Sequence, residues 1–293
     1  KVDGKMHACG HDGHSAMLLG AAKYLAETRN FDGQVAVIFQ PAEEDGGGGK
    51  VMVDDGMMER FNIAEVYGLH NAPGMPVGTF ATRPGPFLAS ADDLEINITG
   101  RGGHAARPQE CLDPIVIGTE VVQALHALVS RSRDPMQPVV ISITQFHAGD
   151  TSNVIPQTAF INGTLRTMDN EVRAHLMERI TTTAQEIATR HGGSASVEFL
   201  QSYPVTDNHA EQTVKAADVA SMVAGEERVD RNAAAKMGAE DFSFMLLARP
   251  GAFMMIGNGN TAGLHHPDYD FNDEAIPFGC SYWVRLAETT LAG

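Results

Sequence analysis

DLEINITG, at residues 93–100, opens the stretch that decides the fold. Its apolar and polar residues alternate, which is the pattern of a strand with one buried face. Two helical patterns and three further strand-like runs follow it, at residues 113–131, 139–147, 158–167, 170–190 and 194–200. In chain order these elements read strand, helix, strand, strand, helix, strand, which is the order of a ferredoxin-like domain. We therefore expect an α+β domain over residues 91–203.

The residues on either side of this domain have the pattern of an α/β layer. Apolar runs typical of buried strands occur at residues 34–40, 64–70 and 252–256, and helical patterns occur at residues 14–29, 50–58, 208–224 and 274–291. Buried strands that are separated by helices indicate an α/β domain, with active groups at strand ends. The predicted fold class is α/β: a larger domain at residues 1–90 and 204–293, with a mixed sheet flanked by helices, and the ferredoxin-like domain inserted into it.

Composition and charge exclude several classes of protein. The chain has 293 residues, of which 43% are hydrophobic and 20% are charged, so it can bury an ordinary globular core. A formal net charge of −16 disfavours nucleic acid and anionic membrane as partners, because both repel an acidic surface. Three scattered cysteines give no disulfide framework, which fits a reducing compartment and predicts a cytoplasmic protein.

The strongest chemical signal lies near the start of the chain, in HACGHDGH at residues 7–14. Cysteine and histidine alternate there at a spacing of two residues, which suits an extended loop better than one face of a helix. Thiolate and imidazole groups bind zinc, nickel and similar metals. The alternative is a histidine-rich loop with no ligand.

Three further clusters are weak when each is taken alone. Glu43 and Glu44 follow the predicted strand at 34–40, although adjacent carboxylates often lie only on a solvated face. His70 ends the predicted strand at 64–70, where a lone histidine is often structural, and His265 and His266 lie in a polar loop. Together with the first cluster they supply thiol, imidazole and carboxylate groups from successive α/β loops. One carboxylate can bind a metal while its neighbour takes a proton from water.

Five motifs give the sequence a family resemblance. ACGHDGH, PAEEDGGGG, GLHN, GAEDF and LHHPDYDFNDE occur in this order. The chain thereby resembles, over its full length, the family of hippurate hydrolase, bacterial N-acyl amino acid amidohydrolases and plant auxin-conjugate hydrolases. That family is similar in turn to aminoacylase and glutamate carboxypeptidase. Its members carry a further N-terminal segment, and this sequence opens inside a motif at Lys1, so we expect it to be N-terminally incomplete.

The resemblance implies a dinuclear metal centre with two divalent ions per subunit, for which Mn, Zn, Ni and Co are all suitable. Cys9 would be the bridging ligand and Glu43 the general base. His266 would not bind metal, because the family varies at that position. The implied metal ligands are Cys9, His11, Glu44, His70 and His265.

The resemblance also assigns roles within the inserted domain. His104 would reach across a homodimer interface and stabilise the oxyanion in the partner's active site. Asn153 and Arg166 would bind the substrate, because a guanidinium matches a carboxylate. The alternatives are that His104 caps a glycine-rich turn in its own domain and that Arg166 forms a surface salt bridge. An edge strand at 93–100 or 194–200 would pair with the second copy.

The resemblance implies metal-dependent hydrolysis of the amide bond of a small-molecule N-acyl amino acid, hippurate-like or N-acetylated. One alternative is a dipeptidase or carboxypeptidase of the same superfamily. The cysteine at position 9 favours acyl amino acids, because the peptidase relatives usually carry aspartate there. The other alternative is a truncated, catalytically silent dimer that binds metal.

Overall fold

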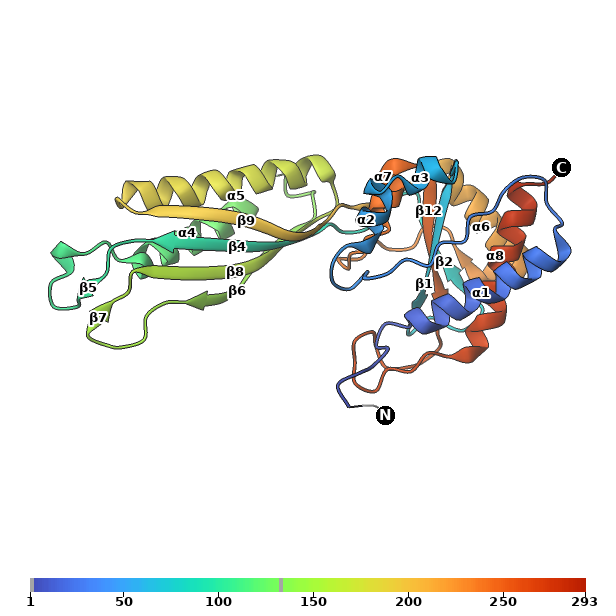
Figure 1. The fold of residues 1–293 in the computed structure, drawn as a ribbon, viewed down its shortest axis with the longest axis horizontal. Helices are drawn as coiled ribbons and strands as arrows, with labels where there is room; N and C mark the ends of the chain where they lie inside the picture. Colours follow the sequence, from blue (N-terminus) through green and yellow to red (C-terminus); the bar gives the residue numbers. More distant parts are fainter. Residues whose placement is uncertain (1–2, 132–133) are drawn as a thin grey trace. The chain divides into compact units, whose positions relative to one another are not determined.

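A computed structural model describes residues 3–131 and 134–293, and these form two compact units (Figure 1). The inserted unit comprises Leu88–Val205 together with Lys236–Glu240, and the outer unit comprises the remaining residues. The sequence did not point to the short segment at Lys236–Glu240. It joins the inserted unit because Lys236 forms a bridge with Leu88, and the Met237 carbonyl accepts a hydrogen bond from Arg166.

The inserted unit has the predicted ferredoxin-like order. Its main elements are β4 (Ala91–Thr99), α4 (Pro114–Arg131), β6 (Val139–His147), β8 (Thr158–Thr167), α5 (Asn170–Arg190) and β9 (Ser194–Tyr203). The strands form one antiparallel sheet in the order β6-β8-β4-β9. β4 therefore lies inside the sheet, so only β9 of the two strands expected at an edge is an end strand, and β6 forms the other end.

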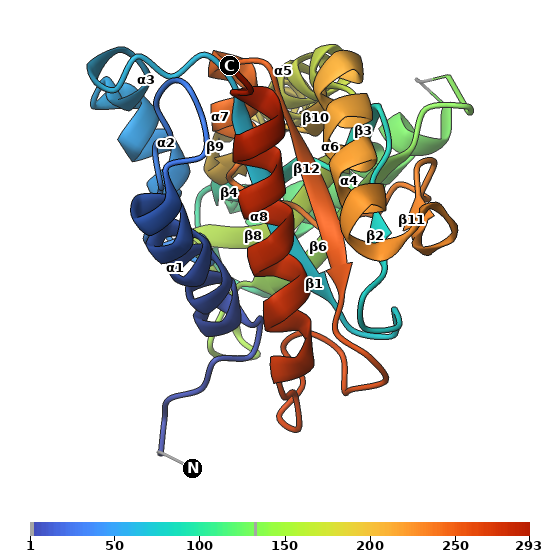
Figure 2. The same ribbon diagram turned by 90° about the vertical axis from the view of Figure 1, so that its right-hand side faces the viewer.

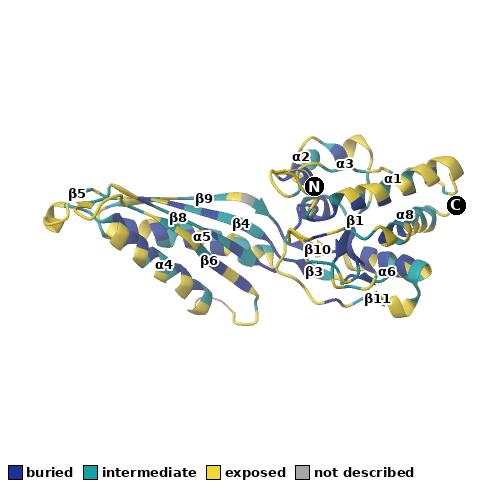
Figure 3. Cartoon of the chain, turned by 90° about the horizontal axis from the view of Figure 1, so that it is seen from below, coloured by how far each residue is buried: buried dark blue, intermediate teal, exposed yellow. Residues whose placement is uncertain are grey.

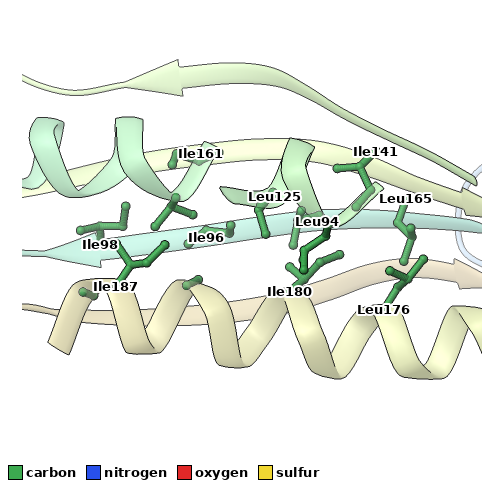
Figure 4. Close-up of a cluster of buried hydrophobic side chains, with 14 of the residues drawn as sticks. Leu94, Ile96, Ile98, Leu125, Ile141, Ile161, Leu165, Leu176, Ile180 and Ile187 are labelled. Atoms are coloured by element: carbon green, nitrogen blue, oxygen red, sulfur yellow. The ribbon is translucent and has the colours of Figure 1, made fainter. Parts of the chain in front are cut away.

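Alternation along β4 builds the core of this unit (Figure 4). Leu94, Ile96 and Ile98 are fully buried, while the residues between them are more exposed. Both helices pack against the sheet and against each other, and they contribute Leu125, Leu176, Ile180 and Ile187. The Asp169 side chain accepts the Glu171 and Val172 amides at the start of α5 and so caps this helix.

The outer unit is built on a mixed sheet. β1 (Val66–Ala72) runs parallel to β12 (Gly251–Gly257), β12 is antiparallel to β2 (Phe80–Ala81), and β2 is parallel to β11 (Val229–Asp230). A separate pair joins β3 (Gly85–Leu88) to β10 (Thr206–Asn208). All of β12 is buried, as its unbroken apolar sequence predicts.

Helices flank this sheet, and α1, α8 and α6 stand in a row in Figure 2. Met17 of α1 and Tyr282 of α8 are fully buried, and they share one apolar cluster with Met254 and Ile256 of β12. Buried and exposed residues alternate along the helices of this unit, as the colours of Figure 3 show. The helices of the outer unit are α1 (His11–Thr28), α2 (Gly48–Asp54), α3 (Met57–Arg60), α6 (Ala210–Ala224), α7 (Ser243–Ala248) and α8 (Ile276–Thr290). Among the described residues, no helix is both long and apolar enough to span a bilayer.

Two predicted elements of the outer unit are wrong. Residues 34–40 form no strand, because no neighbouring strand in the described chain forms hydrogen bonds with their backbone groups. The side chains of Val37 and Phe39 are exposed. The single helix predicted at 50–58 is divided into α2 and α3 at Gly56, whose φ of 79° is left-handed.

Candidate metal centre

Four separate segments of the outer unit bring potential ligands together. They are the start of α1, the turn before α2, strand β1 and the loop between β12 and α8. In each of three groups the ligand atoms all lie within 4.8 Å of one another: Cys9 with His11 and His70, Cys9 with Glu44 and His265, and His11 with Glu43 and Glu44. The structure thus brings together Cys9, His11, Glu44, His70 and His265, the ligands that the family resemblance implied, with Glu43, the implied base.

The turn into α1 presents the first two potential ligands, Cys9 and His11. The helix begins at His11, three residues earlier than expected, so the extended loop ends at Gly10. Gly10 has a left-handed φ of 86°, and a Cβ there would lie 2.3 Å from the Tyr269 hydroxyl and 2.5 Å from Asn71 Nδ2. Only glycine satisfies both the backbone conformation and the close packing. The turn that separates Cys9 from His11 is therefore fixed by its surroundings.

His70 lies within β1, whereas the sequence suggested that it ends the strand. Its Nδ1 is 2.7 Å from the Asn71 carbonyl oxygen, which can only accept, so Nδ1 carries the proton. The Nε2 lone pair then faces the Cys9 thiol at 3.3 Å, and both residues are buried. A histidine that donates its far ring N–H to a carbonyl has the arrangement typical of metal-ligating histidines.

The adjacent carboxylates have different surroundings. The Glu43 side chain is 19% exposed and lies 3.6 Å from His11 Nε2. The Glu44 side chain is 47% exposed and lies 3.1 Å from His265 Nε2. Burial, followed by the negative charges of Glu44 and Asp241, raises the pKa of Glu43 to about 7. Glu43 is thus the carboxylate whose environment favours holding a proton near neutral pH.

The chemistry of this donor set fits a divalent metal. One thiol, three imidazoles and carboxylates approach one another closely, whereas without a cation the neighbouring acidic groups would repel one another. Borderline metals accept such a mixed set of sulfur, nitrogen and oxygen donors.

Sequence reasoning did not find Asn71 and Tyr269, and it counted His14 among the possible ligands. His14 Nε2 accepts the Asn71 backbone N–H at 2.9 Å, and Tyr269 donates to Asn71 Oδ1 at 3.0 Å. Burial, followed by the neighbouring rings of His70 and His11, holds the pKa of His14 well below its usual range. A polar residue inside the buried GLHN run was the signal that could have identified Asn71.

The remaining predicted residues belong to the inserted unit. His104, in β5 (Gly103–His104), pairs with β7 (Val154–Ile155), and the Ala105 N–H donates to the Asn153 carbonyl at 3.1 Å. The residue after His104 therefore faces Asn153 on the neighbouring segment. Arg166 lies in β8, where its Nη1 donates to the Met237 carbonyl at 3.2 Å. Within the part of the chain that the structure describes, Arg166 has no carboxylate partner, so the salt-bridge alternative has no support there.

Several known proteins are similar to this chain over most of its length. The family described as Peptidase family M20/M25/M40 matches residues 1–289. Hippurate hydrolase of Campylobacter jejuni is 39% identical over 98% of this chain and 75% of its own length. N-acetylcysteine deacetylase of Bacillus subtilis is 37% identical over 99% of this chain and 76% of its own length. Thermostable carboxypeptidase 2 of Saccharolobus solfataricus is 39% identical over 89% of this chain, and the match spans 66% of that relative.

A solved structure gives the same result for the fold. A dinuclear metal binding peptidase from the M20 family of Bacillus subtilis superposes with a TM-score of 0.82 and is 32% identical in sequence. The match covers 99% of this chain and 75% of that one.

Proposed function

Because the chain belongs to peptidase family M20/M25/M40, we propose that it hydrolyses the amide bond of N-acyl amino acids at a dinuclear metal centre. Hydrolase chemistry is the property of the family, and the predicted amidohydrolase class is confirmed at that level. The observation that carries the proposal is the convergence of ligand-type side chains from four distant segments. The N-acyl preference rests on similarity to the hippurate hydrolase and the deacetylase.

Two divalent ions, drawn from Mn, Zn, Ni and Co, would when bound polarise the amide carbonyl and acidify water. Five side chains would hold them: Cys9, His11, Glu44, His70 and His265. In this proposal Glu43 has the remaining task of moving a proton. It accepts the proton of the attacking water and returns it to the leaving nitrogen, which suits a carboxyl whose pKa is raised to about 7 by burial.

His104 would supply the oxyanion donor from the second subunit of a homodimer. Its Nδ1 accepts the Ala106 N–H at 3.1 Å, so in the neutral ring the proton is on Nε2. Nε2 is then a hydrogen-bond donor on an exposed side chain, as oxyanion stabilisation requires. The same contact is the turn cap that was the alternative role, and one ring can serve both purposes through its two nitrogens.

Substrate binding is proposed for Asn153 and Arg166. The guanidinium can bind the free carboxylate of the amino acid, which the acyl group leaves ionised. The substrate is thus a small molecule with an amide at the metal centre and a carboxylate at the guanidinium. A cytoplasmic location is part of the proposal, because Cys9, Cys111 and Cys280, which all lie among the described residues, form no disulfide.

The test is a substrate panel on metal-loaded protein. Hippurate, N-acetyl amino acids and simple dipeptides are compared by kcat/KM with each metal, and a Glu43→Gln variant serves as the control for contaminating hydrolases. We expect the acyl amino acids to be preferred. A clear preference for dipeptides or C-terminal residues of peptides would favour the carboxypeptidase alternative, which the similarity to carboxypeptidase 2 supports. Stoichiometric metal with no turnover on any substrate would favour the silent metal-binding dimer.

A further inference from the structure

Asn71 connects the two most buried ligands of the metal centre. It follows His70 directly in β1, and its side chain is fully buried. Its Nδ2 donates to the Cys9 carbonyl oxygen at 2.6 Å. A single side chain therefore ties the loop that carries Cys9 to the strand that carries His70.

The orientation of this amide is fixed by its partners. A carbonyl oxygen can only accept, so the atom nearest the Cys9 carbonyl is the amide nitrogen. The second proton of that nitrogen faces His14 Nε2 at 3.0 Å, and Oδ1 accepts the Tyr269 hydroxyl at 3.0 Å. The protons and the oxygen of the amide thus have partners on three sides. A flipped amide would place an oxygen against the Cys9 carbonyl and would lose these hydrogen bonds.

The partners are themselves held in place. His14 Nε2 also accepts the Asn71 backbone N–H at 2.9 Å, so this ring nitrogen is occupied as an acceptor and is not available to a metal. Gly10 leaves just enough room, because a Cβ there would lie 2.5 Å from Asn71 Nδ2. The loop that carries Cys9, strand β1, helix α1 and the loop that carries Tyr269 are therefore all linked through Asn71.

We propose that Asn71 is a positioning residue for the metal centre. By fixing the main chain of Cys9 against β1, its amide holds the Cys9 thiol and the His70 ring facing each other before any metal binds. Tyr269 and His14 act through Asn71, because they fix the orientation of its amide. The inference rests on the proposed metal-binding role of Cys9 and His70. Groups that orient metal ligands typically change metal affinity about 10- to 100-fold when they are removed.

The test uses Co²⁺ titration of the metal-free protein, followed by the thiolate-to-cobalt charge-transfer band in the near ultraviolet. This band reports the bond between Cys9 and the metal, which activity alone would not. Asn71→Ala should bind Co²⁺ about 10- to 100-fold more weakly and show a weaker band. Tyr269→Phe, which removes one hydrogen bond from the amide, should shift both readouts in the same direction by less.

Asn208→Ala is the matched control. Asn208 is also a buried asparagine of the outer unit, and its amide hydrogen-bonds to Thr82, Arg83 and Phe253, none of which is a ligand. This variant should lower thermal stability but keep the wild-type affinity for Co²⁺ and the wild-type band. Equal weakening in Asn71→Ala and Asn208→Ala, or wild-type binding in Asn71→Ala, would overturn the inference. Where Asn71→Ala does not fold, Tyr269→Phe decides on the same two readouts.

Cys9→Ser separates this inference from the proposed function. Loss of the band in Cys9→Ser together with a normal band in Asn71→Ala would reject the positioning role alone. Retention of the band in Cys9→Ser would reject the ligand assignment, and the positioning role with it.

Discussion

Cys9 is the only thiol among the nitrogen and oxygen donors of the candidate centre. It belongs to two of the three ligand groups, one with His11 and His70 and the other with Glu44 and His265. His11 and Glu44 also belong to two groups each, so the bridging role proposed for Cys9 rests on the family resemblance. Cys9→Ser should therefore lose most of the bound metal, and elemental analysis of purified protein after dialysis measures this. Equal metal content in the wild type and the variant would show that Cys9 does not bridge.

Glu43 and Glu44 are adjacent in sequence, but we predict that they have separable roles. Glu43→Gln should keep the metals and lower kcat by roughly 10²- to 10⁴-fold, because an amide cannot accept the proton. Glu44→Gln should lose metal, since it removes a ligand close to His265. Metal content and kcat measured on both variants decide the point. If Glu44→Gln kept its metal and lost only rate, the two roles would have to be exchanged.

At the scale of elements, the left-handed turn before α1 makes a sharp prediction. Gly10→Ala adds a methyl group against Tyr269 and Asn71, in addition to the strain of φ 86°. Gly74 has nearly the same φ, 87°, with open space around its Cα, so Gly74→Ala isolates the strain, which is about 1 kcal/mol. We expect Gly10→Ala to weaken metal binding at least about 10-fold, because it displaces residues that orient ligands. Gly74→Ala should only lower stability. Titration calorimetry and thermal unfolding of both variants test the difference.

Elements with a complete local pattern could be predicted from the sequence. Alternation in β4 and β8 and the helical period of α5 depend on neighbours within one domain, and all three elements were predicted within a few residues. The run at 34–40 has the composition of a buried strand, but composition cannot supply a hydrogen-bonding partner, and none lies beside it in the described residues. A β-strand needs a neighbouring strand to satisfy its backbone hydrogen bonds, so this prediction was wrong.

The candidate site shows the same limit. Motifs pointed to the proposed ligands and base, because ligand types are few and their spacing is recognisable. Asn71 and Tyr269 are ordinary polar residues whose contacts form only when distant loops meet, so little in the sequence pointed to them. The sequence could suggest which side chains gather at this place, but it could not predict the hydrogen bonds that orient them.

At the scale of the whole molecule, the proposed homodimer predicts complementation between inactive subunits. His104→Ala and Glu43→Gln should each be nearly inactive. If His104 acts on the partner's metal centre, a mixed dimer has one site with both groups intact and regains activity. If both residues act within one chain, each site of the mixed dimer lacks one group. Activity after mixing, with subunit exchange verified by mass spectrometry, is the measurement. Exchange without rescue would reject action across the interface.

Ala91 of β4 is paired with Tyr203 of β9, and these two residues lie near the two ends of the inserted unit. This pairing affects the order in which the two units fold. The parallel pair of β1 and β12 joins segments far apart in sequence, and the flexible loop between them would cost about 5 kcal/mol of closure entropy. If the inserted unit forms first, pairing of Ala91 with Tyr203 already brings its ends together and shortens that loop, which lowers the closure cost by roughly 1 kcal/mol. Pulse-labelled hydrogen exchange during refolding should therefore protect the amides of β4 and β8 before those of β1 and β12. Mutations that slow assembly of the inserted unit should then delay formation of the metal centre, although they touch no ligand.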